Sequence, residues 1–310
     1  MAKGQTSVFL KRVRNGGIFR VPREIKIHRL AMAAQVEHGP FTARLLGYRR
    51  GIFSSELHIE RLDGPSPKHI GELSDVGALI ARVEANTNRL FKVRRVAIDP
   101  KLDFYLSGAR HGRRYDISSI AAAYRRNNQP PFPEFEDIVQ LCATSIARNE
   151  AQLMGAEPVL SHLDHLAKNF IRTGEGVFLI DWGEGYIGRR GFDAGSFLMV
   201  LLRSYDVSRF ESEANLFCRS YLARAIGGPD VLAAMNRVFL PRSLWYFLRP
   251  DIVSRFQTIG KLDEWRAKLL ILGRFASGQF WRHAGLSDGE RSTEGTGHKG
   301  RPEASALGGR

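Results

Sequence analysis

Three oxygen-bearing side chains lie close together near the middle of the chain. Asp164 and Asn169 belong to a polar run, and Asp181 directly follows an apolar run over residues 177–180. A polar run, a short strand and a carboxylate at the strand's end can bring oxygen ligands towards one point. Two carboxylates and an amide oxygen suit a hard cation, and magnesium keeps its other positions for water and phosphate. The set favours a magnesium–nucleotide complex over a zinc site.

The spacing of these residues matches a known pattern. His162-x-Asp164-x-x-x-x-Asn169, followed by Asp181, resembles the catalytic loop and metal-binding strand of the aminoglycoside phosphotransferase and choline kinase-like family. That family shares the protein kinase-like fold. The resemblance covers roughly residues 7–200 and implies an α+β, two-lobe fold, with a small strand-rich N-lobe, shortened at its start, and a larger, mainly helical C-lobe.

The resemblance also implies an activity. It predicts a small-molecule kinase that moves the terminal phosphoryl group of ATP or GTP, bound with Mg2+, to a hydroxyl of a small molecule. By resemblance, Asp164 would be the catalytic base, and His162 would hold the shape of the catalytic loop. Asn169 and Asp181 would be the metal ligands.

Further positions match the family in the expected order. Lys11 resembles the nucleotide-binding lysine, and Glu24 stands where the family places the carboxylate partner of that lysine. Glu60 lies in a segment that resembles the link between the lobes, so it is expected to contribute to nucleotide binding. Asp193 resembles a later, usually structural Asp that braces the catalytic loop.

The sequence departs from the family pattern at two places. Leu163 follows the catalytic-loop His, where Gly is usual, and His165 follows Asp164, where an apolar residue is usual. Only ten residues precede Lys11, which is too few for the two strands and glycine-rich loop that normally cover the phosphates. These departures keep open a second hypothesis, in which the chain is a weak or inactive pseudokinase that serves as a binding or regulatory module.

The elements that must position these residues can be predicted from pattern. β-Forming residues and alternation predict strands over residues 7–13, 18–20, 42–49 and 56–62, with a helix starting at Pro22 between the second and third. This is the expected N-lobe, residues 1–63. A turn-rich break at residues 63–67 reads as a hinge.

Beyond the hinge, apolar residues recur at three- and four-residue steps, as helices require. Leu73 to Val83 and Ile138 to Leu153 show this spacing, and further helices are predicted over residues 214–225, 230–239 and 263–273. The expected C-lobe is residues 64–285. Residues 286–310 have too few apolar side chains to offset their ordering entropy, so a flexible tail is predicted.

Charge narrows the class of partner. The chain has 46 Lys and Arg and 32 Asp and Glu, a formal net charge of +14, which favours anionic partners and a neutral or anionic acceptor. The Arg runs 94–95, 110–114, 125–126 and 189–190 are interpreted as solvated surface. No nucleic-acid-binding motif accompanies the charge, so no specific nucleic acid partner is predicted.

Other features indicate an intracellular protein without a disulfide framework. Cys142 and Cys218 lie far apart in helical segments and read as small buried hydrophobic residues. The N-terminus has no apolar run of a signal peptide, and no apolar stretch reaches membrane-spanning length, so a cytoplasmic location is expected. A third hypothesis, a metal-dependent hydrolase using His162, Asp164 and His165, needs a further ligand cluster that the sequence does not offer.

Overall fold

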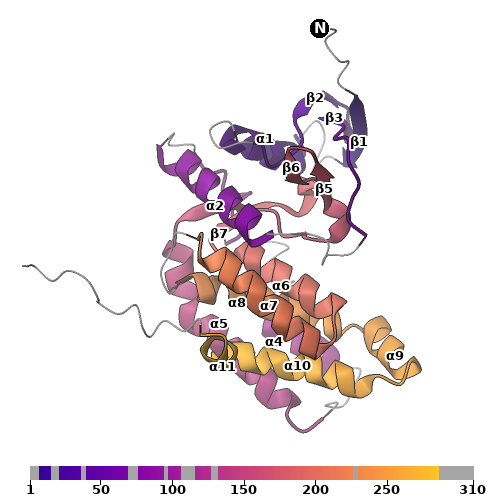
Figure 1. Cartoon of the computed structure of the whole chain (residues 1–310), viewed down its shortest axis with the longest axis vertical. Coiled ribbons are helices and arrows are strands. Elements are labelled where there is room, and N and C mark those ends of the chain that lie inside the picture. Colours follow the sequence, from indigo (N-terminus) through magenta and orange to yellow (C-terminus); the bar gives the residue numbers. More distant parts are fainter. Residues whose placement is uncertain are drawn as a thin grey trace, which may run out of the picture.

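The computed structural model describes residues 7–14, 21–35, 40–68, 76–93, 97–105, 116–126, 132–225 and 230–285. They form a small strand-rich N-terminal part, at the top of Figure 1, and a larger helical part below it. This arrangement confirms the predicted α+β, two-lobe fold class. The predicted tail over residues 286–310 and the strand over 18–20 lie outside the described residues, and the lobe boundary near residue 63 stays a prediction.

The N-terminal sheet has three antiparallel strands in the order β1-β3-β2: β1 (Val8–Arg14), β2 (Leu45–Arg50) and β3 (Ser54–Glu60). In β3, every second side chain is buried, as expected when one face of a sheet is covered. Helix α1 (Arg23–Gln35) begins just after Pro22 and covers that face. Ile25 of α1 packs with Leu57 and Ile59 of β3 in one buried cluster.

Two short strand pairs lie between the sheet and the helices. The strands are β4 (Pro158–Ser161), β5 (Phe170–Thr173), β6 (Gly176–Leu179) and β7 (Tyr186–Arg189). Strand β4 pairs with β7, and β5 pairs with β6; both pairs are antiparallel. Two single turns of 3₁₀-helix lie between these strands: η2 (Ala167–Asn169) comes just before β5, and η3 (Trp182–Glu184) lies between β6 and β7. The segment over 162–166 therefore runs from β4 to η2, and it is called the catalytic loop below after the family segment that it resembles.

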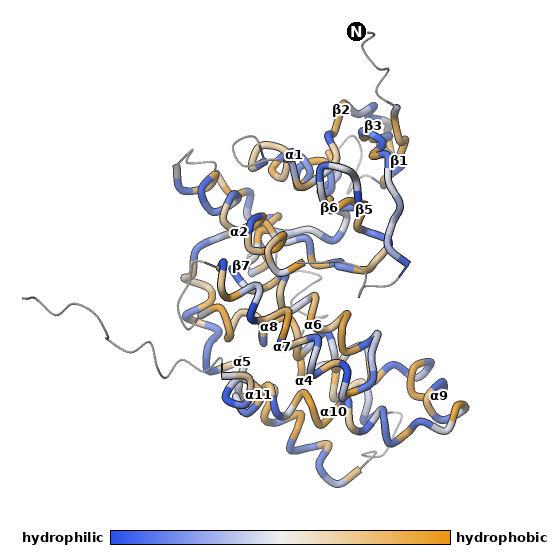
Figure 2. The backbone as a smooth tube through the Cα atoms, in the orientation of Figure 1, coloured by the Kyte–Doolittle hydropathy of each residue, from blue (hydrophilic) through white to orange (hydrophobic). Residues whose placement is uncertain are grey.

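The helical part is built around one almost fully buried helix. The helices are α2 (Val76–Val93), α4 (Ile117–Arg125), α5 (Phe135–Gly155), α6 (Phe192–Ser204), α7 (Val207–Leu222), α8 (Asp230–Phe247), α9 (Pro250–Thr258), α10 (Leu262–Ala276) and α11 (Gln279–His283). In α6, every residue from Phe192 to Leu202 is buried. Gly195 lets α6 approach α8 closely, because a Cβ there would lie 2.2 Å from the Met235 carbonyl oxygen. Figure 2 shows hydrophobic positions along these helices, and many of them belong to one buried cluster.

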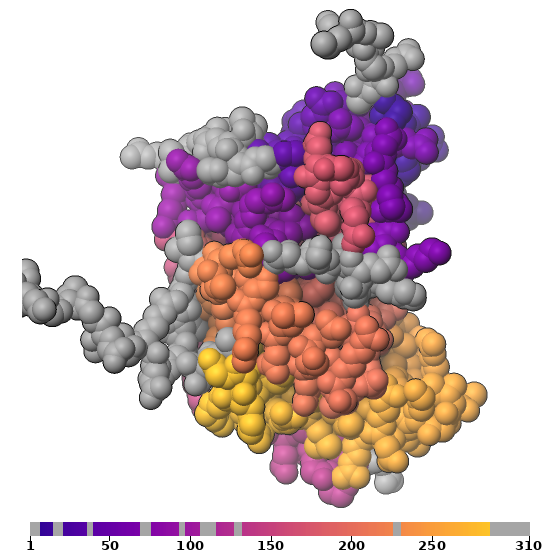
Figure 3. Space-filling model, in the orientation of Figure 1, coloured from indigo at the N-terminus to yellow at the C-terminus, as the bar shows by residue number. Residues whose placement is uncertain are grey.

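The space-filling view shows how the two parts meet on one face of the molecule. In Figure 3, the atoms of the helical part lie directly below those of the strand-rich part. Helix α1, which packs on the N-terminal sheet, also contacts α2. The sheet is therefore attached to the helical part through α1.

Most predicted elements exist, with shifted ends. The strands predicted over 7–13, 42–49 and 56–62 appear as β1, β2 and β3, and the short strands β4, β5 and β7 were not predicted. Four residues give too little alternation to recognise a strand, so these pairs are visible only through their hydrogen-bonding partners.

Helix α8 corrects one prediction. A helix was predicted over 230–239, yet α8 continues through Pro241 to Phe247. Proline removes a helical hydrogen bond and usually ends a helix. Leu240, Leu244 and Phe247 are buried, so continued apolar packing offsets that loss.

Both cysteines are buried and unpaired, as predicted. None of the described helices is long and apolar enough to cross a membrane.

Candidate active site

Lys11 joins the sheet to the loop region of the helical part. It stands on β1 opposite Leu57, and its Nζ donates hydrogen bonds to Oε1 of Glu24 at 2.7 Å and to Oδ1 of Asp181 at 2.6 Å. Burial opposes the charged form of Lys11, but the carboxylates of Glu24 and Asp181 outweigh that effect and raise its pKa. The predicted lysine, its carboxylate partner and one predicted metal ligand therefore meet.

Asp181 follows β6 in an unusual backbone conformation. Its φ of 64° lies in the left-handed region, which Asp tolerates better than most residues. There its carboxylate caps η3 by accepting from the Gly183 amide at 3.4 Å. Burial favours the neutral acid, but the hydrogen bond and charge of Lys11 win, and the pKa of Asp181 is lowered. The carboxylate is therefore charged at neutral pH.

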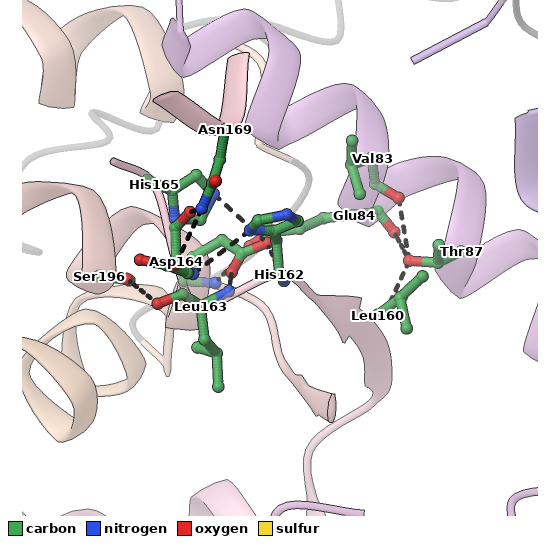
Figure 4. A network of polar contacts seen from close by, with 12 residues as sticks. Val83, Glu84, Thr87, Leu160, His162, Leu163, Asp164, His165, Asn169 and Ser196 are labelled. Atoms are coloured by element: carbon green, nitrogen blue, oxygen red, sulfur yellow. Dashed lines mark hydrogen bonds and ion pairs between the residues drawn. The ribbon is translucent and has the colours of Figure 1, made fainter. Parts of the chain in front are cut away.

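Asp164 and Asn169 form the second half of the site (Figure 4). The Nδ2 of Asn169 donates to the main-chain oxygen of Asp164 and to its Oδ2, both at 2.8 Å. The main-chain oxygen of Asn169 accepts from the Ile180 amide at 2.9 Å, so Asn169 lies beside the residue that precedes Asp181. The catalytic loop and the end of β6 are thus held together.

His162 also connects the catalytic loop with the residue that follows β6. Its Nε2 lies 2.7 Å from the Ile180 carbonyl oxygen, and its ring packs edge-on against Trp182 with centroids 4.7 Å apart. Burial lowers the pKa of His162, so its neutral ring donates to that carbonyl group. His162 therefore links the catalytic loop to the residue that precedes Asp181.

Leu163 occupies the loop position where the family usually has Gly. Its φ is 60°, in the region that glycine favours, so the Leu side chain is accommodated in a conformation that costs it about 1–2 kcal/mol. Its side chain is buried in a cluster with Phe104, Phe192 and Val238. The departure therefore keeps a glycine-like backbone while anchoring the loop through apolar packing.

His165, the second departure, is fully buried. Both its ring nitrogens lack a hydrogen-bond partner among the described residues, and the nearest carboxylate oxygen, of Asp193, lies 3.9 Å away. Burial lowers its pKa well below the usual range. Within the described ranges, no three His, Cys, Asp or Glu side chains gather as a metal site, which gives the hydrolase hypothesis no support.

The donor set suits a hard cation. Asn169 uses its Nδ2 protons on Asp164, which turns its amide oxygen away from Asp164. The charged Asp181 carboxylate follows Ile180, whose amide binds Asn169. One amide oxygen and one or two carboxylates are the ligands that Mg2+ takes beside phosphates.

Glu60 is the one predicted site residue that the structure keeps apart. Its place in the register with Val8 puts it on the opposite face of the sheet from Lys11. There its carboxylate accepts from Arg44 Nε at 3.1 Å and from Arg44 Nη2 at 2.8 Å. Its side chain is thus engaged on the outer face of the sheet.

The site also contains basic residues to which the sequence analysis gave no role. Arg23 donates to the Gly183 carbonyl oxygen and stacks on Tyr186 at 4.0 Å, so it ties α1 to the segment after Asp181. Arg242 of α8 donates to the Leu163 carbonyl oxygen. The Arg–Glu pair at the start of a helix was the only sequence signal for Arg23, and nothing local signals Arg242.

Arg189 corrects the interpretation of the Arg runs. It is buried, not solvated, and its Nη1 lies 3.1 Å from Asp103 Oδ2. Its Nε donates to the Leu153 carbonyl oxygen at 3.0 Å. A buried guanidinium needs several acceptors, and this one has them. The runs 94–95 and 110–114 lie outside the described residues.

Comparison with known proteins supports the fold. No protein-family model and no curated protein matches the chain. Amicoumacin kinase hAmiN, solved with AMP-PNP, Ca2+ and Ami, is similar over 86% of this chain and 83% of that chain, with 13% identity and a TM-score of 0.56. This likeness confirms, at the level of the fold, the resemblance inferred from sequence.

Two other solved structures overlap most of the chain with lower scores. A choline/ethanolamine kinase family protein from Mesorhizobium loti is 14% identical, with a TM-score of 0.48, over 89% of this chain and 91% of that chain. The GDP complex of an aminoglycoside 2'-phosphotransferase IIIa mutant is 13% identical, with a TM-score of 0.49, over 88% and 93%.

Proposed function

We propose that the chain is a phosphotransferase that moves the terminal phosphoryl group of a magnesium nucleotide to a hydroxyl of a small molecule. The observation that carries this proposal is the double ion pair of Lys11 with Glu24 and Asp181. It brings an ammonium group, to which we assign the phosphates, next to a charged carboxylate, to which we assign the metal. The catalytic loop with Asp164 adjoins that carboxylate through the bond between Asn169 and Ile180.

The proposed roles follow from positions and hydrogen bonds. Oδ2 of Asp164 is held by Asn169, so Oδ1 is the oxygen presented to the acceptor hydroxyl, whose proton it takes as the phosphoryl group arrives. When nucleotide binds, the Lys11 ammonium exchanges its bond to Asp181 for one to the phosphates and keeps its bond to Glu24. Asn169 and Asp181 are proposed to hold Mg2+, which when bound neutralises charge on the phosphates.

Phosphoryl transfer needs little covalent help from the protein, so positioning and charge carry most of the effect. The neighbour amicoumacin kinase was solved with a nucleotide analogue and a divalent cation, which agrees with this class of co-substrate. For Glu60 we propose only a main-chain contribution to nucleotide binding, since its side chain pairs with Arg44 on the other face.

The test is a transfer assay. A thermal-shift screen with ATP, GTP and Mg2+ selects the nucleotide, because ligands that bind the folded state raise its stability. Labelled nucleotide is then incubated with candidate sugars, amino acids and other small alcohols. Glu24→Gln should lower transfer about tenfold or more, whereas the matched variant Glu60→Gln should leave it within about twofold. Absence of transfer to any acceptor would defeat the proposal.

One observation favours the alternative, a pseudokinase that acts as a binding or regulatory module. Strand β1 pairs only with β3 among the described residues, so the far edge of the lysine strand carries no partner strand there. The same screen separates the hypotheses. Nucleotide binding without transfer, or no nucleotide binding at all, would favour the pseudokinase.

A further inference from the structure

One edge of α2 is turned towards the strands that flank the catalytic loop (Figure 4). Glu84, Thr87 and Asn88 are three and four residues apart, so they share one face of the helix. Their side chains bind main-chain or side-chain groups on β4 or on the segment after β7. None of them belongs to the site described above.

Glu84 is the carboxylate of α2, and only 1% of its surface is exposed. Its Oε1 accepts from the Gly191 amide at 2.9 Å, and its Oε2 is hydrogen-bonded to the Tyr221 hydroxyl of α7 at 2.6 Å. An acidic group in such a place is costly unless its oxygens are hydrogen-bonded, and both are. The side chain therefore connects α2, α7 and the start of α6.

Gly191 has a backbone conformation and a close contact that exclude other residues. Its φ is 91°, and a Cβ there would lie 2.6 Å from the Val231 carbonyl oxygen, so only glycine fits. Two residues later, in the first turn of α6, the Asp193 carboxylate accepts from the amides of His162 and Leu163, both at 2.9 Å. The place of Gly191 thus sets where Asp193 holds the catalytic loop.

Thr87 acts on the other side of the loop. Its hydroxyl accepts from the Leu160 amide at 3.0 Å and donates to the Val83 carbonyl oxygen at 2.9 Å. Leu160 lies on β4, two residues before His162, and its neighbour Ile187 on β7 completes the strand pair. Strand β4 leads into the catalytic loop. Thr87 therefore holds the end of β4 at which the loop begins.

We propose that α2 positions the catalytic loop, with Glu84 holding the segment that carries Asp193 and Thr87 holding the strand that enters the loop. Through them, α2 sets the orientation of Asp164 without touching substrate. The kinetic consequence rests on the proposed phosphotransferase function, whereas the structural consequence does not. Glu84 and Thr87 are therefore positioning residues.

The test compares Glu84→Met with Glu84→Gln. The Met variant loses both acceptor oxygens at similar volume, and kcat should fall about 10- to 100-fold, because small displacements of reacting groups are costly. The affinity for Mg-nucleotide should change less than about twofold, since Lys11 and Asp181 are untouched. The Gln variant keeps an oxygen for Gly191 and should recover kcat to within about threefold.

A matched control separates positioning from general loss of stability. Lys268 is also buried and donates to the Leu202 carbonyl oxygen at 2.7 Å, at the far end of α6. Lys268→Met should lower the melting temperature while kcat stays within about threefold. An equal loss of kcat in Lys268→Met and Glu84→Met would overturn the proposal.

Hydrogen exchange gives a readout that needs no activity. In Glu84→Met, the amides of His162 and Leu163 should exchange about tenfold faster or more, whereas Lys268→Met should leave them protected. If the wild-type protein transfers no phosphoryl group, the proposed function fails and this exchange result alone decides the role of α2. If Glu84→Met does not fold, Thr87→Val and Tyr221→Phe provide the same comparison, and unchanged exchange in both would refute the role.

Discussion

The catalytic loop and the strand that carries Lys11 contribute to one candidate site, but they are supported differently. In the loop, the amides of His162 and Leu163 are both held by the buried Asp193 carboxylate. On β1, by contrast, Val8, Phe9 and Leu10 are 46–56% exposed, and among the described strands β1 lies at the edge of its sheet.

The difference teaches where pre-organisation resides. The loop is fixed by bonds within the helical part, so Asp164 and Asn169 are placed before any ligand arrives. The position of Lys11 depends more on its ion pairs with Glu24 and Asp181, which bridge from β1 to α1 and to the end of β6. We therefore expect loop variants to affect chemistry, and β1 variants to affect nucleotide affinity as well.

The largest expected effect is at Asp164, the proposed base. Asp164→Ala should lower kcat by about 10²–10⁴-fold, the usual contribution of a general base, while nucleotide affinity changes little. Steady-state kinetics and calorimetry on the same preparation check both parts. A large loss of nucleotide affinity in this variant would contradict the separation of the two regions.

Lys11→Ala tests the other region. Removing its ammonium leaves Glu24 and Asp181 without their shared cation, so both nucleotide affinity and kcat should fall, each by about tenfold. The matched control is Lys26→Ala, which breaks the more exposed ion pair with Asp99. That pair is expected to contribute little, and similar losses in the two variants would argue against a specific role for Lys11.

The backbone of Leu163 tests whether the catalytic loop is held in a strained conformation. Leu163→Ala should lower the free energy of unfolding by about 2–4 kcal/mol, because a buried side chain is lost. Leu163→Gly should be no less stable than Leu163→Ala, since glycine relieves the φ of 60°. At Leu160, a buried strand residue, glycine should instead be clearly worse than alanine. Denaturant unfolding of the four variants decides. If glycine is as unfavourable relative to alanine at position 163 as at position 160, the loop is not strained there.

The last prediction concerns pH and is measured as stability, not as activity. Burial raises the pKa of Glu84 to about 8, with Tyr221, Asp193 and Arg190 as the groups that face it. Because its pKa in the unfolded chain is near 4.5, the unfolded state loses this proton first, and stability falls as pH rises from about 4.5 to 8.

Glu84→Gln has no carboxyl proton to lose, so its stability relative to wild type should improve by roughly 4 kcal/mol between pH values of about 5 and 8.5. Chemical denaturation at several pH values measures this difference. The neighbouring Asp193, whose pKa burial raises to about 7, also titrates in this range and interacts with Glu84, so Asp193→Asn and the double variant complete the comparison. A pH-independent difference would show that Glu84 does not titrate in this range.

Much of this site was predictable because its signals are local. Lys11 in a β-forming run, and Asp164, Asn169 and Asp181 at fixed spacing, carry their chemistry in residue type and order. The side of the sheet on which Glu60 lies depends on strand register, which its own neighbours do not reveal. The bonds of Glu84 and Arg242 join residues 79 to 137 positions apart, so only the folded structure brings them into view.

The central claim, that Asp181 and Lys11 form a magnesium–nucleotide site, is tested most directly by calorimetric titration. ATP and GTP are titrated into the wild-type protein and into Asp181→Asn, with and without millimolar Mg2+. We expect binding to the wild type that strengthens with Mg2+, and a variant that loses this dependence. Equal binding by both proteins, or no binding to the wild type with Mg2+ present, would contradict the account.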